Sequence, residues 1–399
     1  MPSKIKKRGK DSYLLTVVHE QKEYTKTIQA ESKPEAEQQW TLFAAEVLKG
    51  KVLSGDSDKM TLAQFYEYWK KHYAEDHLEI TTRTLLEGVY DRIGAALGHI
   101  RIDKITPKQI LNFYEQLRAP DASVDDTPLS QAYIRKHASL LKTLLNTAYQ
   151  WDFITKNPCD KVKLPKAGRS SKRIPSEEEL KQFFAALSTH KILKHRLWVM
   201  LSFSLGMRRE EIFGLKWKEV NFDKHTLTIA LAAVYVPKHG VVIKDTKTDN
   251  SYRTISLPPD IVAMLADWKE EVKAAAKRRA KRNKVVVLDD PVGPDKWLFT
   301  KWDGSVAHPH SFNSFLSSFC EEHNLPLISP HTFRHLSGSY LLKSGLDIAT
   351  ISAKLGHSDK SFTLKTYIHE LQSAEEHSAE VMQGILDRLK PSDSKGQAK

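Results

Sequence analysis

Cysteine is nearly absent from this chain, since its 399 residues include only Cys159 and Cys320. Two cysteines cannot build a disulfide framework or a thiolate metal site, and this usage is typical of a reducing compartment. No apolar run approaches the roughly 20 residues that a membrane span requires. The first ten residues include five basic ones, but no apolar segment follows, so a secretory signal is not expected. We therefore expect a cytoplasmic protein without a membrane partner.

Acidic residues are outnumbered, with 49 Asp and Glu against 61 Lys and Arg and a net charge of +12. This balance favours a polyanionic partner. Nucleic acid is the first candidate, because lysines and arginines that displace phosphate counterions gain affinity without reading sequence. A basic protein with no such partner is the alternative.

The length of 399 residues is sufficient for two or three domains.

The N-terminal region has the pattern of a small sheet followed by a helix. Ser12–His19 and Lys22–Gln29 are β-rich runs joined by a very short connection, which is typical of a hairpin. A turn before them would add a basic edge strand at Lys4–Arg8. A helical pattern then begins at Pro34. We expect residues 1–55 to form one small domain.

Residues 60–165 have a helical pattern throughout. Capping-box sequences begin two of the helices, at Thr61 and Thr106. The last strong helix begins near Ser130 and places its leucines on one face. We expect this region to be a helical bundle of about 100 residues.

A basic linker follows, with six Lys or Arg and no acidic residue between Lys161 and Pro175. It is either a solvated connection or a basic strap between two domains that grip a duplex together. The candidate DNA-binding residues are Lys4, Lys6, Lys7, Arg8, Arg135, Lys142, Lys166, Arg169, Lys172 and Arg173.

The third segment, residues 174–390, mixes helices with a few short strands. Helical patterns occupy 176–189, 193–205, 259–283, 310–323 and the chain from 330 onward, and strand patterns occupy 226–236, 241–243 and 253–257. Lys273–Lys284 holds seven basic residues and no acidic one, which suits either a phosphate-binding patch or an exposed helix face. Residues 391–399 are expected to form a disordered tail. The fold class is mainly α with small β elements, of the α+β kind.

Two segments place arginines where rigid backbone supports them. Gly206 is expected to end a helix and Glu211 to lie near the start of the next, so Arg208 lies at a corner where Glu211 orients its guanidinium. Ser329 and Pro330 are a cap and a first residue, which places His331 and Arg334 on one helix face near the N-terminus. Backbone N–H groups there favour an anion, and a guanidinium forks onto two phosphate oxygens. Singly, each pattern is also typical of an ordinary ion pair or cap.

Two further residues lie close together toward the C-terminus. Gly356 is expected to end a helix, with His357 exposed at the turn that follows. Tyr367 lies on a short helix ten residues later. Taken alone, either side chain would be interpreted as structural.

Together these residues resemble the tyrosine recombinase (phage integrase) family. Its active site combines Gly-x-Arg-x-x-Glu, His-x-x-Arg, Leu-Gly-His and a tyrosine near the C-terminus. This sequence matches with Gly206/Arg208/Glu211, His331/Arg334, Leu355/Gly356/His357 and Tyr367. The family also uses a lysine in a β-hairpin, within a Lys-Thr segment before an Arg-Thr-Ile strand. Lys247 takes that position here, and Lys244 is the nearby rival.

The resemblance implies a metal-independent mechanism with no cofactor. Tyr367 attacks a DNA phosphate and forms a 3′-phosphotyrosine, while Arg208, Arg334, His331 and His357 stabilise the transition state and Lys247 protonates the leaving oxygen. Integration or excision of a mobile element in a prokaryotic, nucleoid-associated setting follows from the same resemblance.

The resemblance also assigns the domains and the partners. Residues 1–55 are similar to an arm-type DNA-binding domain, 60–165 to a core-binding domain and 174–390 to the catalytic domain. The expected partners are double-stranded attachment sites, three further copies in a tetramer, and an excisionase or DNA-bending accessory protein. Residues 374–390 form an amphipathic pattern suited to packing on a neighbouring protomer or on its own domain.

Three rival functions remain at this level. A type IB topoisomerase shares the Arg/Lys/Arg/His/Tyr set. A zinc hydrolase is suggested by the i, i+4 spacing of His331 and His335, but the intervening residues include no Glu and Arg334 would repel a cation. A DNA-binding protein without catalysis would need neither Tyr367 nor Lys247.

Overall fold

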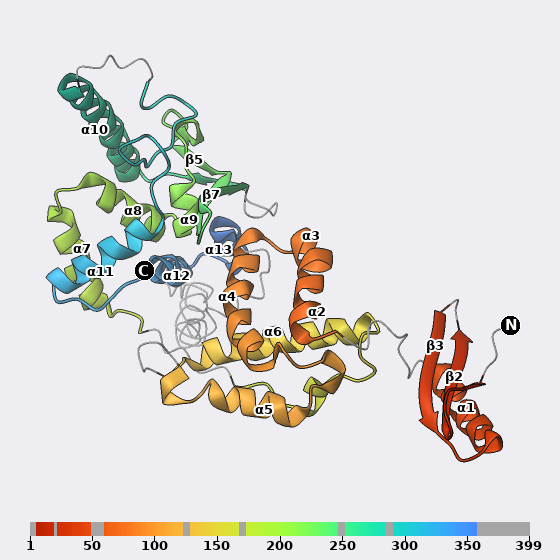
Figure 1. Ribbon diagram of the computed structural model, residues 1–399. Coiled ribbons are helices and arrows are strands. Elements are labelled where there is room, and N and C mark those ends of the chain that lie inside the picture. Colours follow the sequence, from red (N-terminus) through yellow and green to blue (C-terminus); the bar gives the residue numbers. More distant parts are fainter. Residues whose placement is uncertain are drawn as a thin grey trace, which may run out of the picture. The chain divides into compact units, whose positions relative to one another are not determined.

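The computed structural model describes residues 5–19, 22–48, 60–122, 128–166, 173–245, 252–283 and 290–356. The chain divides into two compact units, Met1–Ser171 and Lys172–Lys399. Figure 1 labels most of the helices and several of the strands. Each unit is described by itself below.

The first unit begins with a three-stranded antiparallel sheet, ordered β1 (Ile5–Lys7), β2 (Ser12–His19) and β3 (Lys22–Gln29). Helix α1 (Lys33–Leu48) packs against this sheet and buries Phe43 over Leu15. The indole of Trp40 donates to the carbonyl of Thr16 at 2.8 Å, which ties helix to strand. The predicted sheet and helix are confirmed.

The rest of this unit is helical, as predicted. Its elements are α2 (Leu62–Trp69), the π-helical turn η2 (Lys70–Ala74), α3 (Glu75–His77), α4 (Ile80–Leu97), η3 (Ile102–Lys104), α5 (Pro107–Gln116), η4 (Pro120–Ala122), α6 (Gln131–Gln150) and η5 (Pro158–Lys161). Thr61 and Thr106 each form the expected capping box. The leucines of α6 are buried in the bundle core, where Ile154, Cys159 and Val162 also pack after α6 has ended.

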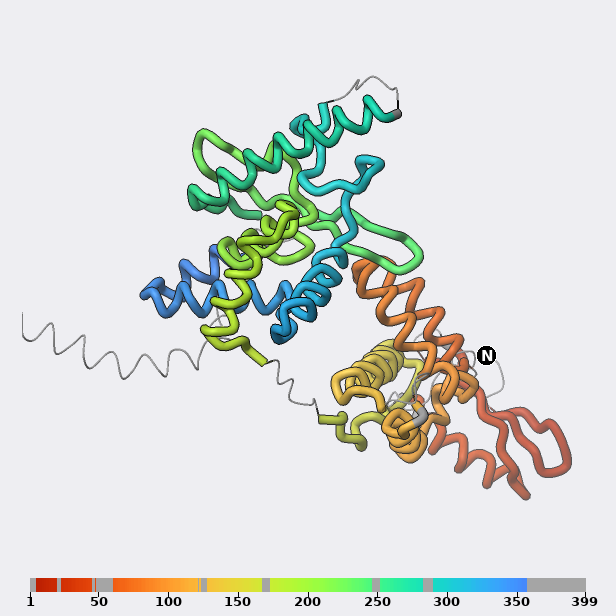
Figure 2. Tube along the Cα trace, turned by 90° about the vertical axis from the view of Figure 1, so that its left-hand side faces the viewer, coloured from red at the N-terminus to blue at the C-terminus, as the bar shows by residue number. Residues whose placement is uncertain are grey.

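In the described part of the second unit, helices and two small sheets surround one large core. Its elements are α7 (Glu177–Thr189), α8 (Leu193–Ser204), α9 (Arg209–Phe213), η6 (Trp217–Glu219), β4 (Val220–Asn221), β5 (Thr226–Ile229), β6 (Leu231–Val236), β7 (Gly240–Asp245), β8 (Arg253–Ser256), α10 (Pro259–Asn283), α11 (His310–Glu322), α12 (Pro330–Lys343) and α13 (Ile348–Leu355). Helix α8 contacts both α10 and α12, so it lies between them. The trace in Figure 2 shows α10 and α12 on opposite sides of α8.

One strand prediction needs correction. The run 226–236 was expected to be one strand, but β5 and β6 belong to different sheets. β5 pairs with β4 and β8, whereas β6 forms a hairpin with β7. Helix α9 approaches β6 closely at this switch, because a Cβ on Gly214 would lie 2.5 Å from the carbonyl oxygen of Leu231. The apolar pattern continues through both strands and does not indicate the change of partner.

The chain from 330 onward contains a break that the helical pattern did not indicate. α12 ends at Lys343, and Gly345 has a left-handed φ of +89° before α13 begins.

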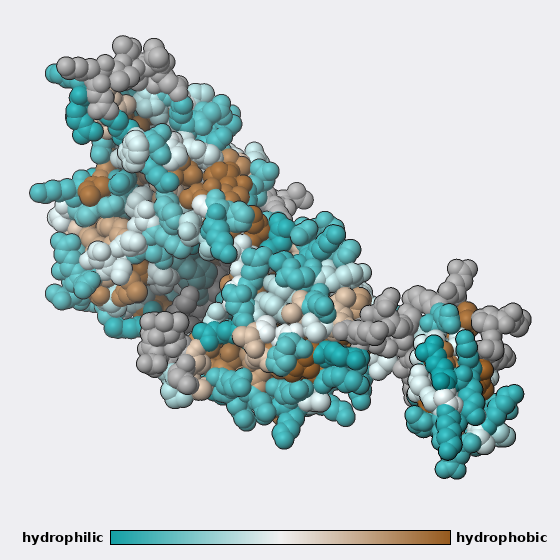
Figure 3. Space-filling model, viewed as in Figure 1, coloured by the Kyte–Doolittle hydropathy of each residue, from teal (hydrophilic) through white to brown (hydrophobic). Residues whose placement is uncertain are grey.

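In the space-filling view, an apolar patch lies over the β6–β7 hairpin, whose residues Val241–Ile243 are half-buried (Figure 3). Among the described helices, none has the length and apolar character to cross a membrane.

Candidate active site

Arg208 lies at the corner between α8 and α9, as the sequence indicated. Gly206 supports this corner with a φ of +66°, and Arg208 is the residue that caps α9. Its guanidinium donates to Glu211 Oε1 at 2.7 Å and to the carbonyl of Gly356 at 2.9 Å. About a third of the side chain (37%) remains exposed. The guanidinium is thus held by two contacts while it still reaches solvent.

Glu211 is shared between two arginines. Besides Arg208, it accepts from Arg253 on β8 at 3.1 and 2.9 Å, in a bidentate ion pair with both side chains buried. Burial alone would raise the pKa of Glu211. The hydrogen bonds and charge of Arg253, followed by the charges of Arg208 and Arg334, outweigh it and hold that pKa below its ordinary value. Glu211 is therefore a carboxylate at neutral pH, suited to orient arginines and not to carry protons.

Arg334 is more deeply buried than the sequence indicated, with 3% of it exposed. It lies in the second turn of α12, and its guanidinium donates to the carbonyl of Gly206 at 2.6 Å and to that of Leu355. The sequence pattern predicted that its guanidinium would fork onto two phosphate oxygens. Part of this donor capacity instead joins the 206 turn to the end of α13.

These groups border one cleft of about 380 Å³. It is lined by Arg208, Arg209, Glu210, Asn313, Ser329, Pro330, His331 and Arg334. Ser329 caps α12, so the N-terminus of that helix opens onto the cleft and His331 lies exposed beside it. This cleft is suited to an anion, because three arginines, a histidine and a helix N-terminus border it and, among the described residues, only one glutamate does.

Several predicted site residues lie outside the described residues, namely Lys247, His357 and Tyr367. Lys244, the rival to Lys247, lies on β7. Burial lowers the pKa of its amine, and it is not among the residues that line the cleft. The described structure therefore brings Arg208, Glu211, His331 and Arg334 together and leaves the other three unplaced.

The candidate DNA-binding residues fall into several groups. Those with exposed positions are Lys6, Lys7, Arg8, Lys166 and Arg173; Arg135 and Lys142 are half-buried; Lys4, Arg169 and Lys172 lie outside the described residues. Arg135 donates to the carbonyl of Pro165 at 2.8 Å, so it also has a structural contact. Arg173 is paired with Glu179 at 2.5 Å, although no acidic residue lies in the linker itself.

Arg253 contacts the site although no motif in the sequence marked it as functional. It was used only to mark the strand after the lysine segment. Its guanidinium joins β8 to Glu211 and, through Nε at 2.8 Å, to the carbonyl of Lys354 at the end of α13. The sequence did contain one signal for this role. Arg253 alternates with Ile255 on the inward face of a short strand, where a basic residue is unusual, and both are buried.

The zinc alternative has no support within the described part of the chain. No group of three His, Cys, Asp or Glu side chains there has the arrangement needed to hold a metal ion. His335 is half-buried on α12, beside the buried Arg334.

Comparison with known families identifies the class. The sequence profile of the phage integrase family matches residues 174–374, and that of the phage integrase N-terminal SAM-like domain matches residues 61–118. The chain belongs to the phage integrase family of tyrosine recombinases.

One known relative is similar to this protein along nearly the whole chain. A "Tyrosine recombinase XerC-like" protein of Caldanaerobacter subterraneus subsp. tengcongensis is 25% identical over 95% of this chain and 98% of its own length. The Tn1549 transposon integrase in complex with transposon right end DNA has a similar fold, with a TM-score of 0.63, 20% identity, and coverage of 80% of this chain and 100% of that one. A lambda integrase tetramer bound to a Holliday junction gives a TM-score of 0.51 at 16% identity, covering 90% and 97%.

The family decides between the functions that the sequence left open. The protein is a tyrosine-type site-specific recombinase, which cleaves and rejoins DNA through a 3′-phosphotyrosine intermediate. The topoisomerase and the non-catalytic alternatives are not favoured.

Proposed function

We propose that Tyr367 is the nucleophile and that the scissile phosphate is bound in the cleft between Arg208, His331 and Arg334. The observation that carries this proposal is that Arg208 and Arg334 lie together at the N-terminus of α12. Arg334 donates to the carbonyls of Gly206 and Leu355, and Arg208 donates to that of Gly356, so the same two turns hold both arginines. Attack by the phenolate on phosphorus forms the 3′-phosphotyrosine and releases a 5′-hydroxyl. The energy of the broken bond is kept in the new ester for rejoining.

In this proposal the cleft stabilises the charge that develops on phosphorus. The phosphorane transition state carries additional negative charge on its non-bridging oxygens. Arg208 offers the donors that its contacts with Glu211 and Gly356 leave over, and the N-terminal amides of α12 favour the same charge. His331 and His357 supply further donors. Preorganised donors of this kind need no metal ion.

Two proton transfers complete the proposed reaction. The unperturbed pKa of tyrosine is near 10, so Tyr367 needs a base or nearby cations, and His331 is the candidate base. Lys247 protonates the leaving 5′-oxygen as general acid. Lys244 is its rival, because burial lowers the pKa of its amine and so eases proton release.

We further propose the domain roles and the assembly. Residues 1–55 contact arm-type DNA, 60–165 contact the core site, and 174–390 catalyse strand exchange within a homotetramer assisted by accessory proteins. The Tn1549 integrase in complex with transposon DNA supports the contact with DNA, and the lambda integrase tetramer on a Holliday junction supports the tetramer. Each Tyr367 acts on the site bound by its own protomer.

A nicked duplex tests the assignment of Tyr367. The full chain is incubated in EDTA with a nicked target-site duplex from the mobile element's ends, and denaturing gels reveal a covalent protein–DNA adduct. We expect an adduct with the wild-type protein and with Lys224→Ala, an exposed surface control, and none with Tyr367→Phe. An adduct of equal yield with Tyr367→Phe would refute the assignment.

A further inference from the structure

The C-terminal half of α10 carries a concentration of positive charge that the proposed catalysis does not use. Six basic residues and no acidic one lie between Lys273 and Asn283. Lys273 is paired with Glu270 at 2.7 Å, whereas the five from Lys277 to Arg282 are exposed. The helix dipole favours cations in the last turn of a helix. That effect accounts for Lys281 and Arg282 but not for the three cations before them.

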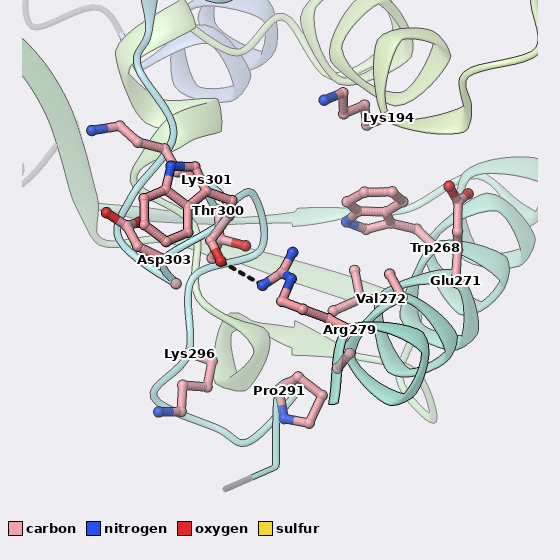
Figure 4. A pocket seen from close by; sticks show the side chains of 14 residues that line it. Lys194, Trp268, Glu271, Val272, Arg279, Pro291, Lys296, Thr300, Lys301 and Asp303 are labelled. Atoms are coloured by element: carbon pink, nitrogen blue, oxygen red, sulfur yellow. Dashed lines mark hydrogen bonds between the residues drawn. The ribbon is translucent and has the colours of Figure 1, made fainter. Parts of the chain in front are cut away.

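The segment 296–304 lies beside this part of α10 and adds to it. The two border a cleft of about 590 Å³. Arg279 points across the cleft and donates to the carbonyl of Trp302, whereas the amine ends of Lys296 and Lys301 point away from α10 (Figure 4). The indole of Trp302 is 79% exposed. This contact joins the 296–304 segment, with its exposed Trp302 ring, to the basic helix.

This region is separate from the candidate active site. The two clefts share no lining residue. Helix α8 contacts both α10 and α12, and α10 lies on the side of α8 that faces away from α12 and α13 (Figures 1 and 2). A duplex whose phosphate occupies the catalytic cleft is therefore not the one that α10 faces.

We propose that Lys277, Arg278, Lys281, Arg282, Lys301 and Trp302, here called the α10 surface, bind the backbone of a second duplex DNA segment. The cations neutralise phosphates on successive helical turns, and the exposed indole packs against sugar and base edges. A protein partner would require an apolar interface core. Among the residues that line the cleft, Trp302 is the one large apolar side chain that is mostly exposed.

The salt dependence of DNA binding tests this proposal. The full chain with Arg278→Gln, Lys281→Gln and Arg282→Gln is titrated with a fluorescent duplex of unrelated sequence at several salt concentrations. Each lost phosphate contact reduces the slope of log K against log salt by about 0.9, so we expect a slope shallower by about 2 to 3.

The matched control replaces three exposed lysines of the same unit, Lys181, Lys191 and Lys224, by Gln. We expect the slope of this control to change by less than about 0.9, the value for one phosphate contact. Identical slopes for the wild type and the α10 triple variant would overturn the proposal.

A cross-link provides the second measurement. A photoreactive benzoylphenylalanine in place of Trp302 is expected to cross-link to the same duplex, and the triple variant is expected to reduce the yield. Illumination that links this position to no DNA would overturn the proposal. Neither measurement requires covalent cleavage. An adduct of equal yield with wild type and Tyr367→Phe would therefore refute the catalytic assignment and leave the α10 surface standing.

Discussion

At the scale of single residues, the buried carboxylate of Glu211 organises the cationic cleft. It accepts from Arg208 and from Arg253, and the latter also donates to the carbonyl of Lys354. A buried ion pair gains little over a well-packed apolar pair, yet removing one partner leaves an uncompensated charge in the interior. Glu211 therefore contributes to both the stability and the geometry of the site.

Replacing Glu211 by Gln should be strongly destabilising. The variant leaves Arg253 buried without its counter-charge, and such losses amount to roughly 3–5 kcal/mol. Urea unfolding measures the change. Glu210→Gln is the control, because its pair with Arg209 is partly exposed and is expected to be worth about 1 kcal/mol or less. Equal shifts of the two unfolding midpoints would contradict this account.

Replacing Arg208 by Lys should slow DNA cleavage while leaving the fold intact. Lysine keeps the charge but cannot fork between Glu211 and a phosphate oxygen. One or two charge-assisted hydrogen bonds are worth about 1.5–3 kcal/mol each, so single-turnover cleavage should fall by at least about tenfold. Arg334→Ala should slow cleavage as strongly. Near wild-type cleavage by either variant would refute its assigned role.

His137 should make the helical bundle sensitive to acid. It is fully buried on α6, and its Nδ1 lies 2.9 Å from the carbonyl oxygen of Tyr133. Burial lowers its pKa, with the charge of Arg92 acting in the same direction and the Tyr133 hydrogen bond opposing them. Unfolding releases this neutral histidine to take up a proton. Its contribution to stability is therefore present above about pH 6.5 and is lost as the pH falls below it.

Denaturant unfolding at pH 7.5 and 5.5 measures this effect. We expect wild type to lose more stability between the two pH values than His137→Leu, by up to about 1.4 kcal/mol per pH unit. The same loss in both proteins would assign the acid sensitivity to other groups.

At the scale of elements, the packing of α9 on β6 depends on the absence of a side chain. A Cβ at Gly214 would lie 2.5 Å from the backbone oxygen of Leu231, which cannot move aside as a flexible side chain could. Within α4, by contrast, a Cβ at Gly88 meets no heavy atom within 4 Å. A side chain therefore has room at Gly88 but not at Gly214.

Alanine at these two positions should have opposite effects. Gly214→Ala is expected to destabilise by about 1–3 kcal/mol, the usual cost of forcing atoms into a packed contact. Gly88→Ala is expected to stabilise by about 0.5–1 kcal/mol, because it removes an unfavourable helix residue without a clash. Thermal unfolding of both variants would show this, and shifts of the same sign would contradict it.

At the scale of the whole molecule, each unit has its own core, and the bundle core is completed after its last long helix. Ile154, Cys159 and Val162 are buried against the helices although α6 ends at Gln150. The bundle is therefore expected to fold by itself only when these residues are included.

A pair of fragments tests this expectation. Residues 60–166 should unfold cooperatively when followed by circular dichroism, whereas residues 60–150 should lose cooperativity or melt at a lower temperature. The larger fragment retains the buried apolar area after α6 and the contact from Arg135 to Pro165. Equal melting of the two fragments would show that the segment after α6 does not contribute.

The sequence alone determined most elements, because their signals are local. Capping boxes at Thr61 and Thr106 begin helices where predicted, and the helical periodicity over 259–283 corresponds to α10. The spacing of Gly206, Arg208 and Glu211 and of His331 and Arg334 indicated the family, which the comparisons confirmed.

Only the tertiary structure decided which distant groups share a contact. The split of 226–236 between two sheets depends on β7 and β8 as partners, and the burial of Arg334 depends on carbonyls at Gly206 and Leu355. Arg253 acquires its role because β8 and α9 approach across the core. Periodicity and capping report a residue's immediate neighbours, whereas the two carbonyls that bind Arg334 lie 21 and 128 positions away from it.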